Sequence, residues 1–250
     1  MNPFDLKGQV AVVTGANTGI GQAVAIALAQ AGASIVAVGR SSMDETEAAI
    51  READVGFHVI KADLGSIEPV KGIVAETIEV FGKLDILVNN AGIIRRADVI
   101  DFTEEDWDAV MDVNLKTAFF LSQAAGRHML ERGSGKIINI ASLLSFQGGI
   151  RIPSYTASKS GLAGLTKLLA CEWAGKGVNV NAIAPGYFVT NNTTALRDDP
   201  DRSEAILARI PAGRWGTPSE MGGAAVFLAS KASDYVHGTV LPVDGGWLAR

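Results

Sequence analysis

The chain has 250 residues, a formal net charge of −5 and a single cysteine. One cysteine excludes an internal disulfide and a cysteine-based zinc site, and the acidic balance argues against nucleic-acid binding, which favours basic surfaces. No apolar run approaches the roughly 18–20 residues of a membrane span, and MNPFDLKGQV lacks the pattern of a secretory signal, so we expect a cytoplasmic protein.

Short β-branched or apolar runs alternate with longer segments of helical periodicity. The expected strands are Val10–Thr14, Ser34–Val38, Phe57–Lys61, Leu84–Asn89, Lys136–Ile140, Val178–Ala184 and Thr239–Val243. The expected helices are Gly21–Ala31, Met43–Glu52, Ile67–Phe81, Glu104–Arg132, Tyr155–Gly175 and Pro218–Ser230. Continuous apolar strands are typical of parallel sheets covered on both faces. The alternation therefore predicts a three-layer, doubly wound α/β Rossmann fold with a seven-stranded parallel sheet, formed by residues 1–250 as one domain.

The first expected strand leads directly into GANTGIG and then into a helical segment. In this order Gly15 permits a tight reversal, Gly19 lets the backbone approach a pyrophosphate, and Gly21 lets the helix pack against the sheet. The N-terminus of the helix supplies unpaired N–H groups and the positive end of its dipole. This arrangement predicts a dinucleotide site, with a purely structural turn as the alternative.

The end of the second expected strand bears on the choice between NAD and NADP. A carboxylate there favours NAD, because it binds both ribose hydroxyls, but this chain has Gly39 followed by Arg40. Arg40 could pair with the 2′-phosphate of NADP or stack on adenine as a solvated surface residue, so the preference stays open. Asp63 could bind the adenine amino group or cap a helix that begins near Ser66.

Tyr155 and Lys159 are four residues apart, so on a helix their side chains share one face. An ammonium beside a phenol lowers the pKa of the phenol and gives an acid/base that is usable near neutral pH. Ser142 ends a strand at the carboxyl edge of the sheet, where its hydroxyl could hold a substrate oxygen. Taken alone, a pair at this spacing is more often an ordinary helix pair.

Hydrolytic and metal chemistry find little support in the sequence. The three histidines, His58, His128 and His237, lie in no nucleophile motif and are expected as surface or packing residues. No cluster has the spacing of metal ligands, so we expect no metal site. Cys171 is expected as a small core residue.

Together the motifs resemble the short-chain dehydrogenase/reductase family over essentially the whole chain. The resemblance rests on TGANTGIG, NNAG, Asn114 within MDVNLK, Ser142, Tyr155, Lys159 and PGYFVT. It implies that Tyr155 is the acid/base, and that Lys159 lowers the pKa of this phenol and binds the nicotinamide ribose. It also implies that Ser142 polarises the substrate oxygen and that Asn114 holds a water that relays protons to Lys159.

The resemblance further implies a site for NAD or NADP. Its residues would be Gly15, Asn17, Thr18, Gly19, Ile20, Gly21, Arg40, Asp63, Leu64, Asn90, Gly92, Tyr155, Lys159, Pro185, Gly186, Phe188 and Thr190. Thr190 and the Phe188 backbone would meet the carboxamide. The polar stretch Tyr187–Arg214 interrupts the strand–helix rhythm after the sixth strand, and we expect it to form a small lid over the ligand crevice.

Within the family, NNAGIIRRAD, IPAGRWG and VDGGWLAR resemble dehydrogenases of deoxy sugar acids. A sugar acid carries a carboxylate, so its site should contain a cation. Arg95, Arg96 and Arg151 follow motifs that line the crevice, and Arg214 lies at the end of the expected lid. The predicted substrate-binding residues are Arg95, Gln147, Arg151 and Arg214.

Two alternatives stay open: a reductase of another carbonyl, such as a 3-oxoacyl thioester, and a catalytically silent dinucleotide-binding sensor. The complete set of tyrosine, lysine, serine and asparagine counts against the sensor. Glu104–Arg132 and Tyr155–Gly175 are apolar on more than one side, which suggests helix packing between subunits. With the resemblance, this predicts a homotetramer.

Overall fold

The computed structural model describes residues 2–250, and its centre is one sheet of seven parallel strands in the order β3-β2-β1-β4-β5-β6-β7. The strands are β1 (Val10–Thr14), β2 (Ser34–Gly39), β3 (Phe57–Lys61), β4 (Ile86–Asn89), β5 (Gly135–Ile140), β6 (Val178–Pro185) and β7 (Val240–Val243). The predicted seven-stranded parallel sheet is confirmed. Because every described strand joins this sheet, the structure supports one domain over residues 1–250, which we retain as a proposal.

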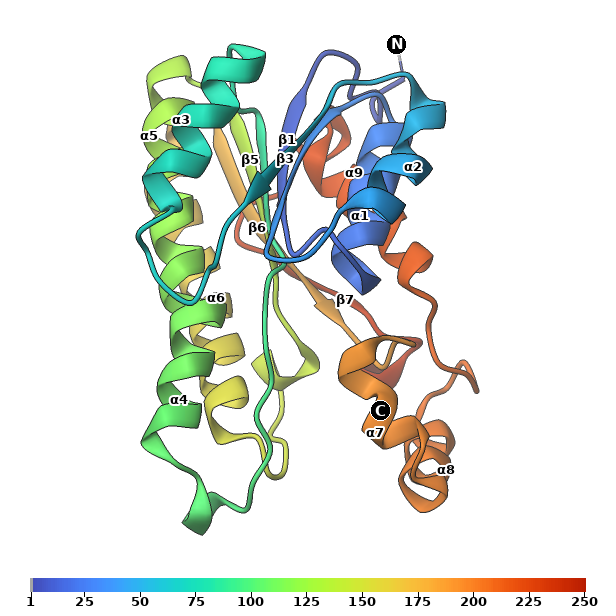
Figure 1. Cartoon of the computed structure of the whole chain (residues 1–250). Coiled ribbons are helices and arrows are strands. Elements are labelled where there is room, and N and C mark those ends of the chain that lie inside the picture. Colours follow the sequence, from blue (N-terminus) through green and yellow to red (C-terminus); the bar gives the residue numbers. More distant parts are fainter. Residues whose placement is uncertain (1) are drawn as a thin grey trace.

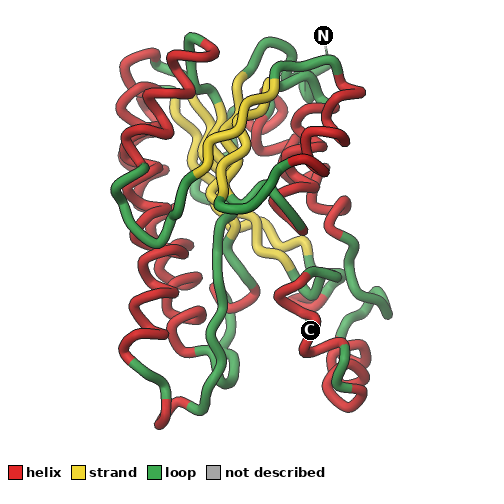
Figure 2. The backbone as a smooth tube through the Cα atoms, in the orientation of Figure 1, coloured by secondary structure: helices red, strands yellow, loops and turns green. Residues whose placement is uncertain are grey.

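Helices cover both faces of the sheet (Figures 1 and 2). On one face lie α1 (Gly19–Gln30), α2 (Asp44–Ile50) and α9 (Gly222–Ala229), and on the other lie α3 (Val70–Phe81), α5 (Ala118–Arg132) and α6 (Pro153–Trp173). Two apolar clusters fill the spaces between the layers, one on each side of the central strands. Burial on both faces explains why the strands read as continuous apolar runs, and the three-layer prediction is confirmed.

The predicted helix Glu104–Arg132 is one rod with a change of winding in its middle. It comprises α4 (Glu104–Met111), a π-helical turn over Asp112–Thr117, and α5. Such single-turn π segments often occur at functional sites, and this one contains the buried Asn114. The change of winding aims that side chain at the loop after β4.

Two local expectations are wrong. The helix expected from Ile67 begins at Val70, directly after Pro69, since proline is suited to the start of a helix and not to its interior. Cys171 is exposed rather than buried. The buried residues of α6 include Leu162, Thr166 and Trp173 at helical spacing, and position 171 lies outside that stripe.

The stretch after β6 extends beyond the carboxyl edge of the sheet. It forms a 3₁₀ turn (Asn191–Thr193), α7 (Thr194–Arg197) and α8 (Pro200–Arg209), which lie together at the lower right of Figure 1. That this stretch closes as a lid stays a prediction. Within residues 2–250, no helix combines the length and apolarity that crossing a membrane requires.

Candidate active site

The loop after β1 forms a backbone cradle in which each glycine has a steric reason. Gly15 and Gly19 have φ values of +65° and +59°, a region that favours glycine. A Cβ on Gly15 would lie 2.9 Å from Nδ2 of Asn90, and one on Gly21 would collide with the carbonyl oxygen of Gly15. The cradle opens at the N-terminus of α1, so these residues fit a dinucleotide pyrophosphate.

A cavity of about 270 Å³ continues from this cradle, and an adjoining pocket of about 180 Å³ extends it towards the end of β2. The predicted cofactor residues that line the larger cavity are Gly15, Asn17, Thr18, Gly19, Ile20, Gly21, Asn90, Gly92, Tyr155, Lys159, Pro185, Gly186, Phe188 and Thr190. The other three, Arg40, Asp63 and Leu64, line the adjoining pocket. The structure therefore brings all of the predicted cofactor residues together.

The adjoining pocket contains an exposed ion pair. Nη1 of Arg40 lies 3.7 Å from Oδ2 of Asp63, while Oδ1 of Asp63 accepts a 2.9 Å hydrogen bond from the backbone N–H of Gly65. Asp63 thus closes a local turn, and because α3 begins only at Val70 it does not cap that helix. A Cβ on Gly39 would lie 2.7 Å from Cε of Met43, so a carboxylate at this position would require Met43 to move.

Asn90 lines the cofactor cavity, but its amide also fixes the cradle. Its Nδ2 donates to the carbonyl oxygens of Thr14 (2.8 Å) and Gly15 (3.3 Å). The Asn90 backbone N–H donates to Oγ1 of Thr14 at 2.9 Å. These bonds join the loops after β1 and β4, the strands between which the order of the sheet reverses, where such sheets bind their ligands.

Tyr155 lies in the first turn of α6, and Lys159 follows one turn later. Lys159 is 3% exposed, and its Nζ donates a 2.6 Å hydrogen bond to the carbonyl oxygen of Ile140. The same nitrogen lies 5.6 Å from the centre of the Tyr155 ring. Ser142 follows β5, and its Oγ accepts a 3.3 Å bond from the backbone N–H of Leu144. The three side chains come from two adjoining elements at the carboxyl edge of the sheet.

The electrostatics of this group differ from the sequence-based expectation. Burial raises the pKa of Tyr155 above its usual value, and hydrogen bonding with Ser142 and the charge of Arg96 oppose this rise. Burial also lowers the pKa of Lys159 to about 8. Because burial has the larger effect, the pKa of Tyr155 lies above its usual value rather than below it. That Lys159 lowers the pKa of this phenol stays a prediction. Arg96 is a cation whose charge favours the phenolate.

Asn114 has little capacity left to hold a water through its side chain. Its Oδ1 accepts a 2.8 Å bond from the N–H of Ile93, and its Nδ2 donates to the Ile93 carbonyl at 3.0 Å and to Ser158 at 3.3 Å. This amide therefore fixes the loop after β4 beside Gly92. A proton-relay water at Asn114 stays a prediction, and the second lone pair of Oδ1 is available to accept a hydrogen bond from it.

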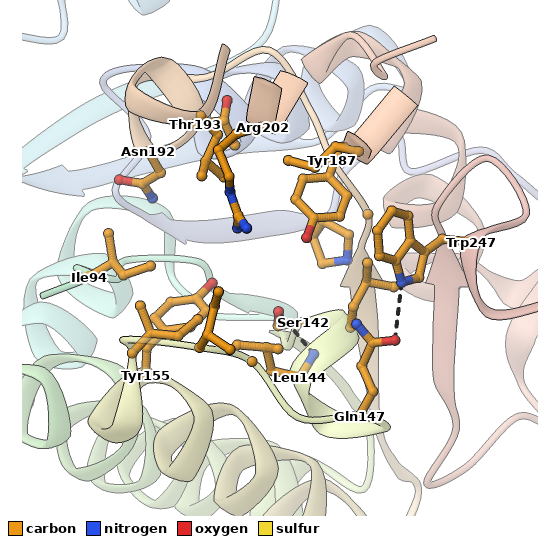
Figure 3. A pocket seen from close by; sticks show the side chains of 18 of the residues that line it. Ile94, Ser142, Leu144, Gln147, Tyr155, Tyr187, Asn192, Thr193, Arg202 and Trp247 are labelled. Carbon is orange, nitrogen blue, oxygen red and sulfur yellow. Dashed lines mark hydrogen bonds between the residues drawn. The ribbon is translucent and has the colours of Figure 1, made fainter. Parts of the chain in front are cut away.

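A second cavity, of about 410 Å³, meets the cofactor cavity at Tyr155 and Ser142 (Figure 3). Much of its wall is apolar and includes Leu143, Ile206 and Trp247. Its charged lining residues are Arg96, Arg202 and Arg209, and no Asp or Glu lines it among the described residues. In a chain with a net charge of −5, this cavity is a local cationic site that suits an anionic ligand.

Of the predicted substrate-binding residues, only Gln147 lines this cavity. The arginines pair elsewhere: Arg95 with Asp106 (3.1 Å), Arg151 with Asp98 (2.9 Å) and Arg214 with Glu220 (2.6 Å). The expectation that these three cations face the crevice is therefore wrong for this structure. Each guanidinium points to a nearby carboxylate, and that pairing could not be identified from the motifs alone.

Arg202 and Arg209 on α8 were missed as site residues, although the sequence contained a signal for them. They are seven residues apart, so on a helix they share a face over two turns. Tyr187 and Trp247 also line the cavity, and their rings contact each other with centres 4.7 Å apart. The three histidines line neither cavity, and His58 pairs with Glu76 at 2.7 Å.

Comparison with known proteins places this geometry among dehydrogenases. A family model described as enoyl-(acyl carrier protein) reductase matches residues 15–248. The 2-dehydro-3-deoxy-D-gluconate 5-dehydrogenase of Escherichia coli is 56% identical over 100% of this chain and 99% of its own. The enzyme of that name from Bacillus subtilis is 58% identical over 99% and 97%, respectively.

One solved structure is as similar to this chain as these two enzymes are. It is described as a 2-deoxy-D-gluconate 3-dehydrogenase from Agrobacterium tumefaciens with bound NADP. It is 58% identical, the match covers 100% of both chains, and the TM-score is 0.95. These relatives carry the names of the deoxy sugar acid group that the sequence motifs resemble.

Proposed function

The chain belongs to the short-chain dehydrogenase/reductase family of NAD(P)-dependent oxidoreductases, and from this premise we propose that it interconverts a hydroxyl and a keto group of a deoxy sugar acid. The substrate would be of the 2-dehydro-3-deoxy-D-gluconate type, after which its relatives are named. The observation that carries this proposal is the position of Tyr155 and Ser142 between a dinucleotide cavity and a cavity whose only charged lining residues, among those described, are arginines.

In the oxidative direction the phenolate of Tyr155 accepts the proton of the substrate hydroxyl. Ser142 holds the same substrate oxygen, so the oxygen lies between a proton acceptor and a hydroxyl donor. In reduction the phenol returns that proton to the forming alcohol. The nicotinamide, when bound, supplies or accepts the hydride.

Lys159 and Asn114 support the site around Tyr155, and a water at Asn114 that relays protons to Lys159 belongs to this proposal. The ammonium of Lys159 is held at the end of β5 by the Ile140 carbonyl, from where it can bind the nicotinamide ribose. Asn114 fixes Ile93 and Gly92, which border the same region. The Arg96 charge favours the phenolate and so assists the oxidative step.

We further propose that NADP is the preferred cofactor. Arg40 is exposed in the pocket at the end of β2, and its one carboxylate partner, Asp63, is 3.7 Å away. A guanidinium can exchange so loose a contact for a 2′-phosphate. No carboxylate stands at Gly39 to bind the ribose hydroxyls in the manner that favours NAD.

The two alternatives have less support. A silent sensor has no use for a buried lysine beside a phenol at the junction of two cavities. A 3-oxoacyl thioester reductase would need room for an acyl carrier at the cavity mouth, and the relatives with 56–58% identity are named for a sugar acid instead.

The test is steady-state kinetics of the purified chain with both cofactors. The substrates are 2-dehydro-3-deoxy-D-gluconate, gluconate, a neutral ketohexose and a 3-oxoacyl thioester. We expect the highest kcat/KM for a sugar acid with NADP. A higher value for the thioester or the neutral ketose would overturn the proposal.

We also propose that the protein is a homotetramer in the cytoplasm. Exposed apolar side chains on the two long helices, including Trp107 (40% exposed) and Leu168 (49% exposed), support packing between subunits. Light scattering at micromolar concentration checks the oligomeric state, and a monomer there would contradict it.

A further inference from the structure

We propose that Arg202 of α8 is the residue that binds the substrate carboxylate, and that it selects a reacting carbon remote from that carboxylate. This inference rests on the proposed function and deepens it by naming the specificity residue. Figure 3 shows the guanidinium of Arg202 extending into the cavity from the side opposite Tyr155. The carboxylate and the reacting oxygen would thus be bound by opposite walls.

Arg202 is the cavity arginine with the most hydrogen-bonding capacity left for a ligand. Within residues 2–250 its side chain forms no hydrogen bond and no ion pair, whereas Nη2 of Arg96 donates to the Asn192 carbonyl oxygen at 2.9 Å. Arg209 stacks over the Trp247 ring at 4.1 Å and donates to Oε1 of Gln147 at 3.2 Å. Arg202 can therefore offer its planar fork to a carboxylate in a bidentate contact.

Arg96 and Arg202 also differ in their distance from the chemistry. Arg96 lies close enough to the Tyr155 phenol for its charge to lower the pKa of that group, whereas Arg202 and Arg209 act on Tyr187 instead. A carboxylate on Arg96 would lie next to the reacting carbon, as in a 2-hydroxy acid. A carboxylate on Arg202 leaves several bonds between the two groups, which suits oxidation or reduction at the far end of a sugar acid.

The position of α8 is fixed by residues from two other segments. Gln147 accepts hydrogen bonds from Arg209 and from Nε1 of Trp247 (3.1 Å). The guanidinium of Arg250 donates to the carbonyl oxygens of Ala208 and Arg209, which end the helix. These contacts satisfy carbonyls that a helix end leaves unpaired and hold Arg202 over the cavity.

The experiment compares a sugar acid with its own carboxamide, which keeps the shape and removes the charge. We expect Arg202→Met to lower kcat/KM for the acid by about 10- to 100-fold, the range for a hydrogen bond to a charged group, mostly through KM. The carboxamide should change by no more than about twofold, and Arg202→Lys should recover part of the loss. Arg51→Met, a surface arginine that lines none of the cavities described above, is the charge-matched control and should match the wild type.

The outcomes separate this inference from the proposed function. If the wild type turns over no sugar acid, both are overturned. If the wild type does so but Arg202→Met leaves the acid unaffected, or impairs acid and carboxamide equally, only the assignment of Arg202 is overturned. Should Arg202→Met fail to fold, the same comparison is made with Arg202→Gln, and circular dichroism and NADP titration check each variant.

Discussion

The side-chain nitrogen of Lys159 donates a 2.6 Å hydrogen bond to the backbone carbonyl oxygen of Ile140, the last residue of β5. This bond ties the catalytic turn of α6 to the carboxyl edge of the sheet. It also places a charged group in a position where it is only 3% exposed. The functional position of Lys159 therefore carries a cost in stability.

Lys159→Met should stabilise the fold while it impairs the enzyme. Because burial lowers the Lys159 pKa to about 8, below the unfolded value of ~10.5, charging this lysine costs the folded state about 3 kcal/mol below pH 8. Methionine removes that cost but leaves the Ile140 carbonyl unpaired, a loss of about 1 kcal/mol. Urea unfolding at pH 7 without added cofactor should show a net gain of ~2 kcal/mol.

That gain should fade as the pH rises from 8 to about 10.5, because both states then release the proton of the wild-type lysine. A gain that does not depend on pH would contradict its attribution to the buried charge. The same variant should bind NADP more weakly and turn over more slowly. Unchanged NADP affinity by titration would exclude the contact between Lys159 and the ribose.

Tyr155→Phe should abolish most turnover and leave NADP binding nearly intact. The ring still packs, but the transferable proton is gone, and general acid–base catalysis typically contributes 10²–10⁴-fold. Stopped-flow or steady-state assays measure the loss, and fluorescence titration measures binding. Tyr235→Phe is the matched control, since Tyr235 is 99% exposed and lines none of the cavities. A rate for Tyr155→Phe near that of the wild type would exclude Tyr155 as the acid/base.

The pH profile should report the Tyr155 phenol. Oxidation needs the phenolate, and burial raises the pKa of this group, so kcat/KM for oxidation should rise with pH into the alkaline range while kcat/KM for reduction falls there. Arg96 lowers the same pKa. Arg96→Met should therefore shift to higher pH both the rise of kcat/KM for oxidation and the fall of kcat/KM for reduction. Arg96→Lys should shift them less.

Arg95→Met is the control for this shift, because Arg95 pairs with Asp106 outside the cavity. Its profile should coincide with that of the wild type. If the pH dependence of kcat/KM in Arg96→Met is the same as in the wild type, the charge at position 96 does not act on the phenol.

Arg40→Ala should weaken NADP much more than NAD. Losing a charge-assisted contact to the 2′-phosphate should raise KM for NADP by about 10- to 100-fold. The KM for NAD, which has no such phosphate, should change little. Equal changes for the two cofactors would mean that Arg40 contacts the adenine and not the phosphate.

Asp85→Asn should destabilise the chain without changing the chemistry. Asp85 is 6% exposed at the edge of the sheet opposite the site. Its carboxylate forms ion pairs with Lys83 (2.9 Å) and Arg132 (2.8 Å). It also accepts a 2.9 Å hydrogen bond from the backbone N–H of Val10. Because Lys83 and Arg132 are about one-third exposed, solvent weakens these ion pairs, and losing the buried charge-assisted hydrogen bonds should cost about 1–3 kcal/mol. Thermal unfolding should show this loss, while kcat/KM at a permissive temperature stays near the wild-type value. An equal loss of activity would tie this cluster to the site.

Local sequence patterns are enough to predict the parts of this protein that depend on the order of neighbouring residues. Continuous apolar strands between helical segments determined the parallel sheet, and GANTGIG between a strand and a helix determined the cradle. The spacing of Tyr155 and Lys159 determined their common helix face. Each pattern acts over a few residues, through backbone geometry or helical period. The local structure can therefore be predicted without knowing which other segments pack against it.

Which cations face the substrate cavity depends on contacts between segments that are distant in the sequence. Arg95, Arg151 and Arg214 follow promising motifs, yet each pairs with a carboxylate outside the cavity, while Arg202 reaches the cavity from α8. An arginine side chain is long and flexible, so the carboxylate with which it pairs depends on which groups the fold places near it. The helical phase that leaves Cys171 exposed depends on the sheet in the same way. Such choices arise from contacts between distant segments, which local pattern does not encode.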